Sequence, residues 1–376
     1  MHAPTIKLFL CGDVMAGRGV DQILPHPCNP RIYEECMASA EGYVRLAEDA
    51  HGAIPRSAPL SHIWGDALFE FERADPDLRI INLETSITRS ESYFPKGINY
   101  RMSPENAACL SSAGVDCCAL ANNHVLDWGP VGLLDTLDAL KRLKIKAVGA
   151  GRSLAEAWAP AAFEIPGKGR VLVFSCACVS SGAPMSWAPA SDGDGIALLP
   201  NLSRRNVAPL ADEISRIVRP GDLVVVSIHC GPNWGDEISD EVRSFAHHLI
   251  DLAPISVLHC HSSHHPKGIE VYRSRLVLYG CGDFINDYEG IPGYEEYRDD
   301  LTLMYFAEIE AESGLLLALE MTPLQLKRFR LSRPSAADVD WLQDRLDRES
   351  RKLGARVSSI SGGRLTLSWF NQTAGT

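Results

Sequence analysis

Seven apolar runs, each about the length of a single β-strand, recur through the first three quarters of the sequence, at residues 5–10, 78–83, 116–121, 170–179, 222–228, 255–260 and 275–281. Uninterrupted apolar runs of this length are typical of strands that are buried on both faces. Helical patterns lie between several of the runs, at residues 129–143, 207–218 and 241–253. This alternation predicts an α/β protein with a layered core.

The pattern also predicts how the chain is divided. A sequence of 376 residues with 45% hydrophobic residues can form one large domain with appendages or two domains. Residues 23–77 are rich in Pro and His and interrupt the strand pattern, so we predict an insertion at the rim of the core. We place the main domain at residues 1–300. Residues 301–376 are predicted to form an extension packed on the core, with an antiparallel strand pair, a surface helix near 336–354 and a last strand.

Composition excludes some classes of partner. The formal net charge is −12, from 48 acidic and 36 basic residues, and no Lys or Arg run is present that would follow a phosphate backbone, so nucleic acid is not an expected partner. The apolar run at residues 6–10 ends at Cys-Gly-Asp, too early for a signal peptide or a membrane span. We therefore expect a cytoplasmic protein without a membrane partner, and we interpret its eleven cysteines as reduced, buried thiols.

Polar clusters follow six of the apolar runs. They read "CGDVM", "NLETS", "ANNHVLDWG", "HCGPNW", "HCHSSHHPKG" and "CGDF". Each cluster alone is compatible with an ordinary turn, a helix cap or a core histidine. Together they lie where strands end, and in open α/β sheets ligands bind outside the carboxyl ends of the strands. The sequence therefore predicts one functional site at that edge.

Histidines are concentrated at one of these strand ends. Four of the twelve histidines of the chain lie within residues 259–265. So many adjacent imidazoles are costly to bury without a metal ion or carboxylates to balance them, which favours metal binding or acid/base chemistry here. We assign His247 and His248 to a helix surface or to packing. The other histidines outside the motifs receive no role; they are His2, His26, His51 and His62.

Five ordered motifs carry a family resemblance. "GDVMAGR", "NLETSIT", "ALANNHVLDWG", "VVVSIHCGPNW" and "HHPKGIEVY…LVLYGCGDFIND" resemble the CapA family of poly-γ-glutamate capsule-associated proteins, which has a calcineurin-like metallophosphoesterase fold. The resemblance spans roughly residues 5–290. It implies a calcineurin-like layered α/β sandwich with a metal site at the C-terminal ends of its strands, so residues 1–300 would be the metal-binding catalytic domain.

The resemblance also implies a set of metal ligands. These are Asp13, Glu84, Asn123, His229 and His261. True metallophosphoesterases carry a histidine two residues after the first aspartate, where this chain has Met15. A thioether does not replace an imidazole on a hard divalent ion, and a two-metal mechanism needs both sites. We therefore predict one divalent ion, either Ca²⁺, Mg²⁺, Mn²⁺ or Zn²⁺.

The remaining imidazoles have carboxylates near them, as residues that move protons near neutral pH commonly do. The predicted catalytic residues are His124, Asp127, His264, His265 and Asp283. Substrate binding is assigned to Asn122, Trp234 and Arg101.

Two such pairs on opposite sides of a peptide would suit removal and return of a proton at a carbon. The favoured hypothesis is a metal-dependent Cα epimerase. It would act on the C-terminal residue of a lasso-peptide precursor, as the epimerases among soluble CapA-like proteins do. The alternatives are a CapA-type protein of poly-γ-glutamate capsule synthesis, with a polyglutamate-like substrate, and a phosphoesterase.

Overall fold

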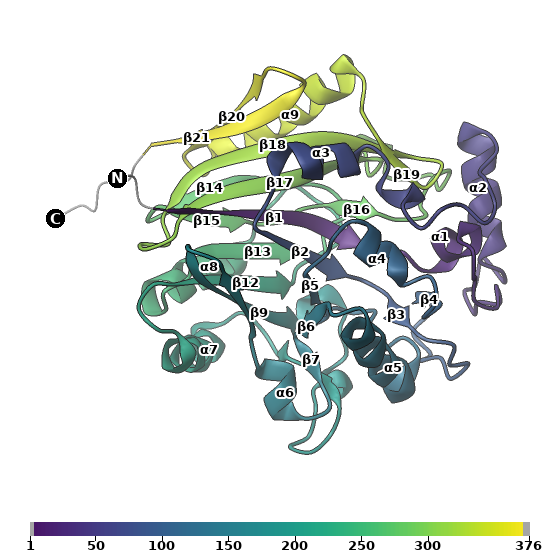
Figure 1. Ribbon diagram of the computed structural model, residues 1–376, viewed down its shortest axis with the longest axis horizontal. Helices are drawn as coiled ribbons and strands as arrows, with labels where there is room; N and C mark the ends of the chain where they lie inside the picture. The colour runs from purple at the N-terminus through teal and green to yellow at the C-terminus, as the bar shows by residue number, and fades with distance from the viewer. Residues whose placement is uncertain (1–3, 371–376) are drawn as a thin grey trace.

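The computed structural model describes residues 4–370 and arranges them in two β-sheets with helices on their outer sides (Figure 1). This arrangement confirms the predicted layered α/β fold. Among the described residues the larger sheet has ten strands. In order they are β20 (Ala355–Ile360), β21 (Arg364–Trp369), β18 (Leu316–Lys327), β17 (Leu301–Glu310), β1 (Thr5–Val14), β2 (Leu78–Leu83), β5 (Cys117–Ala119) and β6 (Lys146–Val148), with β16 (Asp283–Ile285) beside β1 and β19 (Arg330–Ser332) beside β18.

The second sheet has seven strands within residues 4–370. They are β11 (Leu198–Leu199), β9 (Gly169–Cys178), β12 (Asp222–His229), β13 (Val257–His261), β15 (Arg275–Leu278) and β14 (Ile269–Tyr272) in order, with β8 (Ala161–Ile165) beside β9. Strands β9, β12, β13 and β15 are parallel, so their carboxyl ends share one edge. Two short ribbons pair β3 (Ser86–Ile87) with β4 (Arg101–Met102) and β7 (Ala150–Gly151) with β10 (Gly195–Ile196).

The helices are α1 (Arg18–Ile23), α2 (Glu41–His51), α3 (Ala67–Ala74), α4 (Ala108–Ser112), α5 (Gly129–Arg142), α6 (Leu154–Trp158), α7 (Arg204–Ile217), α8 (Asp240–Leu252) and α9 (Ala336–Arg351). Most of them cover the outer faces of the two sheets (Figure 1). Helix α9 instead packs Val339, Leu342 and Leu346 into the cluster between the sheets. The predicted insertion at residues 23–77 carries α2 and α3. Its Ile63 and Trp64 are fully buried against the larger sheet, so this segment is part of the core.

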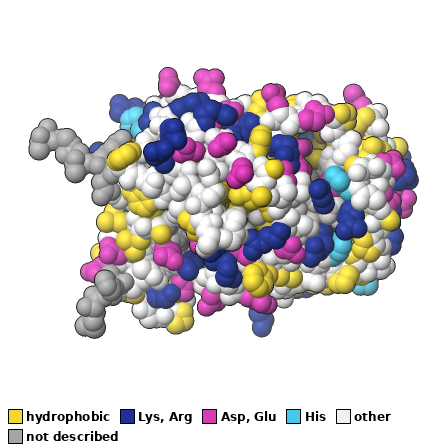
Figure 2. Space-filling model, turned by 90° about the horizontal axis from the view of Figure 1, so that it is seen from above, with side chains coloured by type: hydrophobic (Ala, Val, Ile, Leu, Met, Phe, Trp, Pro, Cys, Tyr) yellow, Lys and Arg dark blue, Asp and Glu magenta, His cyan; other side chains and the backbone are white. Residues whose placement is uncertain are grey.

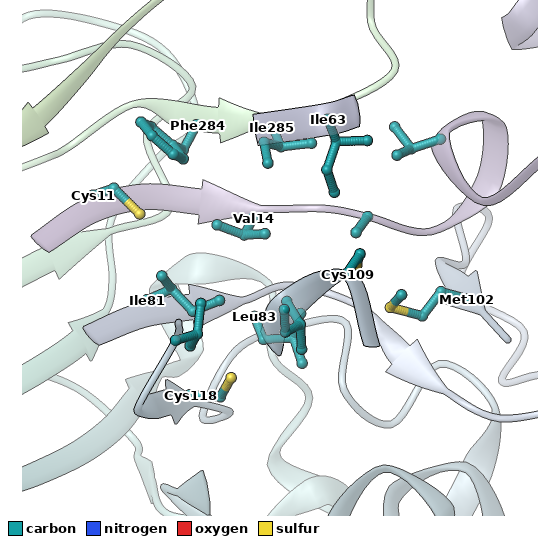
Figure 3. Close-up of a cluster of buried hydrophobic side chains, with 14 of the residues drawn as sticks. Cys11, Val14, Ile63, Ile81, Leu83, Met102, Cys109, Cys118, Phe284 and Ile285 are labelled. Carbon is teal, nitrogen blue, oxygen red and sulfur yellow. The ribbon is translucent and has the colours of Figure 1, made fainter. Parts of the chain in front are cut away.

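Strand β1 shows why the sheets stack. Alternate side chains of a strand point to opposite faces. On one face of β1, Leu8 and Leu10 pack with residues of the second sheet such as Val173 and Val225. On the other face, Phe9 and Cys11 join a cluster under the helices. Figure 3 shows this outer cluster, where side chains from β1, β2, β5 and β16 converge.

The structure corrects several expected element boundaries. The run at 275–281 ends as a strand at Leu278, and Asp283 instead begins β16, which pairs in parallel with β1. Two strands rather than one follow α9. The first of them, at residues 355–360, was not predicted because it buries only alternate side chains and so lacks a continuous apolar run. All eleven cysteines are free thiols, but Cys36 is exposed, contrary to the expectation that all are buried.

The C-terminal segment is joined to the core by main-chain pairing. Strand β17 runs antiparallel to β1 from Leu301 onward, and β18, β21 and β20 continue the larger sheet beyond it. The expected boundary near residue 300 therefore falls between two strands of a single sheet.

The surface is polar and of mixed charge. Lys and Arg side chains are intermixed with Asp and Glu on the face that Figure 2 shows. In the part of the chain that the structure describes, every helix is too short or too polar to cross a bilayer.

Candidate metal centre

Three buried side chains form the centre of the predicted site. One ligand atom from each of Asp13, His229 and His261 lies within 4.8 Å of the other two, and within residues 4–370 this is the one such group of His, Cys, Asp and Glu side chains. His229 and His261 are register partners at the ends of β12 and β13. Asp13 approaches from the end of β1, so the two stacked sheets bring the three side chains together.

A chain of hydrogen bonds behind His261 determines its tautomer. His259 Nε2 lies 2.7 Å from the Cys11 carbonyl oxygen, which can only accept, so Nε2 carries the proton. Burial lowers the pKa of His259 to about 4, which leaves the ring neutral and its Nδ1 an acceptor. The Ser227 hydroxyl, 3.2 Å away, donates to it. Ser227 Oγ then accepts from His261 Nε2 at 2.8 Å, so His261 Nδ1 carries a lone pair.

His229 presents a second lone pair to the same point. Its Nε2 lies 3.0 Å from Asn123 Oδ1, which only accepts, so Nδ1 is unprotonated. The Nδ1 atoms of His229 and His261 are 2.7 Å apart and face one another. Burial lowers the pKa of both rings well below 6.5, so protonation does not remove the conflict at neutral pH. In this arrangement a cation between or beside the two lone pairs would remove the conflict.

The raised pKa values of the buried carboxylates beside these rings also favour a cation at this position. Burial, followed by the charge of Asp283, raises the pKa of Asp13 to about 7. Burial and the neighbouring Asp13 raise the pKa of Glu84 well above its ordinary value. Glu84 Oε1 is 3.8 Å from His229 Nε2. Two neutral imidazoles and one carboxylate are a donor set that fits a divalent metal ion, with Glu84 and Asn123 at its margin.

Two imidazole–carboxylate pairs flank this centre. His124 Nδ1 is 2.7 Å from Asp127 Oδ2, and its ring stacks on Tyr100. Burial lowers the pKa of His124 to about 4. His264 Nδ1 is 2.9 Å from Asp283 Oδ1. Burial alone would lower the pKa of His264, but the charge of Asp283 and its hydrogen bond raise it above the ordinary value.

A cavity of about 480 Å³ connects the two pairs with the centre. Both His124 and His264 line it, as do the candidate ligands Glu84, Asn123 and His229. Trp234, predicted to bind substrate, also lines the cavity and stacks on Tyr294 with ring centroids 3.9 Å apart.

Three of the predicted site residues lie away from this cavity. His265 is fully buried and stacks on Tyr297, so His264 rather than His265 is the partner of Asp283. Arg101 packs over Trp128 and donates to the backbone oxygens of residues 29 and 90.

Asn122 is also buried and does not line the cavity. Its side chain accepts from the backbone amides of His124 and Val125, which shapes the loop. These contacts hold the Asn122 side chain within the loop, and its contact with substrate stays a prediction.

Lys96 is a cavity residue that the sequence pattern did not reveal. Its Nζ lies 2.9 Å from Asp127 Oδ1 and also donates to the Asn123 carbonyl oxygen. Lys96 belongs to a loop between β3 and β4 rather than to a strand end, and no motif marks it. It holds Asp127 and the Asn123 backbone in place.

The fold and the site together define a layered α/β protein with a candidate divalent-metal centre at the carboxyl edge of its sheets. Residues 7–288 match the family model described as bacterial capsule synthesis protein PGA_cap. The chain belongs to this family, the CapA family, as its motifs indicated.

Curated relatives agree with the family match. A probable polyglutamine synthesis accessory protein of Mycobacterium tuberculosis is 46% identical over 354 residues, which cover 94% of this chain and 93% of the relative. The PGA biosynthesis protein CapA of Bacillus subtilis is 25% identical over 294 residues, 76% of this chain and 70% of the relative. The capsule biosynthesis protein CapA of Bacillus anthracis is 25% identical over 237 residues, 62% of this chain and 53% of the relative.

Proposed function

We propose that the protein is a metal-dependent accessory enzyme of glutamyl-polymer synthesis, acting on a polyglutamate- or polyglutamine-type chain. The family match supports a role in capsule or polymer synthesis. The mycobacterial relative, similar along nearly its whole length, is named for polyglutamine synthesis. The names of these relatives support this substrate class over the lasso-peptide precursor favoured from sequence.

The convergence of two imidazole lone pairs 2.7 Å apart beside a buried carboxylate carries the proposal. This arrangement favours a bound cation. A cation at the cavity favours a catalytic role for the protein over passive binding of the polymer. Asp13, His229 and His261 would hold the ion. Among the four candidate metals, two nitrogen donors favour Zn²⁺ or Mn²⁺ over Ca²⁺ or Mg²⁺. When bound, such an ion would polarise a carbonyl or carboxylate oxygen of the substrate.

We assign the proton transfers to the two flanking histidines. Opposite pKa shifts within one site commonly separate an acid from a base. His264, whose pKa is raised by Asp283, is the general acid. His124 is the general base, because its Nδ1 donates to Asp127 and its Nε2 stays unprotonated. Lys96 holds Asp127 in place for this role.

The specific reaction that we propose is inversion at the Cα atom of a glutamyl residue. Inversion needs removal of a proton on one face and its return on the other, and His124 and His264 border the same cavity. His124 as the base and His264 as the acid would then act on a carbon whose carbonyl oxygen would be held at the metal centre.

Short peptides test the proposal. α-Linked pentapeptides of glutamate and of glutamine, and a γ-linked glutamate pentapeptide, would be incubated in D₂O with the metal-loaded protein, and deuterium incorporation, chirality and peptide mass measured. We expect deuterium at Cα, and His124→Gln and His264→Gln should retain metal but lower the rate by about 10²–10⁴-fold. Lysine pentapeptides are the matched control. Glutamyl peptides that emerge with no deuterium, no cleaved bond and no new bond would contradict the proposal.

A further inference from the structure

The cavity beside the centre contains two side chains that are always cationic, and both are already paired. Arg18 lines the cavity, but its side chain is only 2% exposed. Its Nε and Nη2 donate to Asp287 at 2.8 and 2.5 Å, and its Nη1 donates to Glu34 at 3.0 Å. The guanidinium is therefore committed to holding the insertion at residues 23–77 against the core.

Lys96 is committed in the same way. Its ammonium group has three N–H donors. Two of them meet Asp127 Oδ1 at 2.9 Å and the Asn123 carbonyl oxygen, and the nitrogen also lies 3.2 Å from His124 Nδ1. The charge of each cation is therefore already offset by a buried carboxylate before a substrate carboxylate enters.

Carboxylates, in contrast, line the cavity without a Lys or Arg partner among the described residues. Glu84 and Asp299 both border it, and within the described residues neither forms an ion pair with Lys or Arg. Burial and the nearby Asp283 raise the pKa of Asp299 to about 6, as expected where carboxylates already crowd one another. A divalent ion at the centre would add two positive charges, but Asp13 and Glu84 offset them.

The mouth of the cavity is apolar. Ile98, Ile291 and Tyr294 border the cavity and are 46%, 39% and 45% exposed. Tyr294 lies flat on Trp234, with an interplanar angle of 4°. We call these four residues the collar. Exposed apolar side chains gathered around a cavity commonly mark a binding site.

We propose that the cavity takes a glutamyl chain whose side-chain carboxyl groups are amidated, and that Asp299 and the collar reject the polyanionic form. An amide has nearly the shape of a carboxylate but lacks its charge, so it avoids repulsion by Asp299 and needs no cationic partner. The methylene groups of such a chain would pack on the collar. The inference rests on the proposed function, since it presupposes a glutamyl substrate.

Paired pentapeptides test this inference on the full-length, metal-loaded protein. Fluorescent pentapeptides of one linkage would carry their carboxyl groups either free or amidated, and dissociation constants would be measured by anisotropy. We expect the amidated peptide to bind at least about tenfold more tightly, with little dependence on salt.

Variants separate the determinants. Asp299→Asn should strengthen binding of the free-acid peptide about three- to tenfold and leave the amidated peptide unchanged. Tyr294→Ala should weaken binding of the amidated peptide. Glu312→Gln, which removes an exposed carboxylate in the turn after β17, is the matched control and should change neither value.

The outcomes distinguish the two proposals. Tighter binding of the free-acid peptide would overturn the selectivity inference while supporting a glutamyl substrate. Failure of both peptides to bind a folded, metal-loaded protein would overturn the proposed function and the inference with it. An Asp299→Asn variant that leaves the free-acid peptide unchanged would overturn the role of Asp299.

Discussion

Replacing Ser227 by Ala should weaken metal binding although Ser227 does not contact the metal position. The hydroxyl connects two rings, accepting from His261 Nε2 at 2.8 Å and donating to His259 Nδ1 at 3.2 Å. Without it, His261 Nε2 loses its acceptor, and nothing selects the tautomer that keeps the Nδ1 lone pair toward His229. Loss of such a partner of a ligating histidine typically costs 10–100-fold in metal affinity.

That range corresponds to about 1.4–2.8 kcal/mol of binding free energy. The metal-free protein should also become less stable by about 1–3 kcal/mol, because a buried acceptor on His259 loses its donor. Competition with a chromophoric chelator would measure the affinity, and chemical denaturation the stability.

Ser175→Ala is the matched control. Ser175 is the register partner of Ser227 on the neighbouring strand β9, is also buried, and has a hydroxyl without a hydrogen-bond partner. Its removal should leave metal affinity within about twofold. If Ser227→Ala binds metal as tightly as Ser175→Ala does, the reasoning from the hydrogen-bond chain is wrong.

Three further predictions concern the same site. Protein purified without chelator should contain about one divalent ion per chain by elemental analysis, and His261→Ala should lose most of it; two ions per wild-type chain would exclude a single centre. Hydrolysis of aryl phosphates should stay near background with any added divalent ion, because Met15 offers no imidazole; turnover of about 1–10³ per second would restore the phosphoesterase hypothesis. Asp283→Asn should lower the pKa of His264 in the metal-free protein, because the charge of Asp283 raises it. Histidine NMR titration would measure this pKa, and an unchanged value would contradict the assignment.

Much of the fold follows from sequence because its strands are continuous apolar runs. The run at 78–83 coincides with β2, and that at 222–228 ends one residue before the end of β12. Residues at the carboxyl ends of parallel strands must meet at one edge, so Asp13 and His229 could be placed together without knowing the strand order.

The finer arrangement depends on contacts between segments distant in sequence. The tautomer of His259 depends on its hydrogen bond to the Cys11 carbonyl oxygen, which belongs to the other sheet. No local sequence pattern encodes that contact. Ser262 has φ 106°, so the chain turns out of the strand before His264 and His265, and the two side chains diverge. Sequence reasoning left both as candidates, because two adjacent histidines in one motif carry no signal of which one faces the cavity.

Strand β1 pairs with β16 and with β17, and of these two β17 lies outside the family match. The position of Asp13 on β1 therefore depends partly on a segment that the family match does not cover. One edge of β1 is covered by β17 along residues 5–10 and by β16 at Asp13. A chain ended at residue 288, where the family match stops, would leave the β17 side of that edge unpaired and would lack Phe306, against which the buried Phe9 of β1 packs. Unpaired strand edges recruit other chains. We therefore expect the tail to protect the strand that carries Asp13 from self-association and to be needed for the candidate metal site to form.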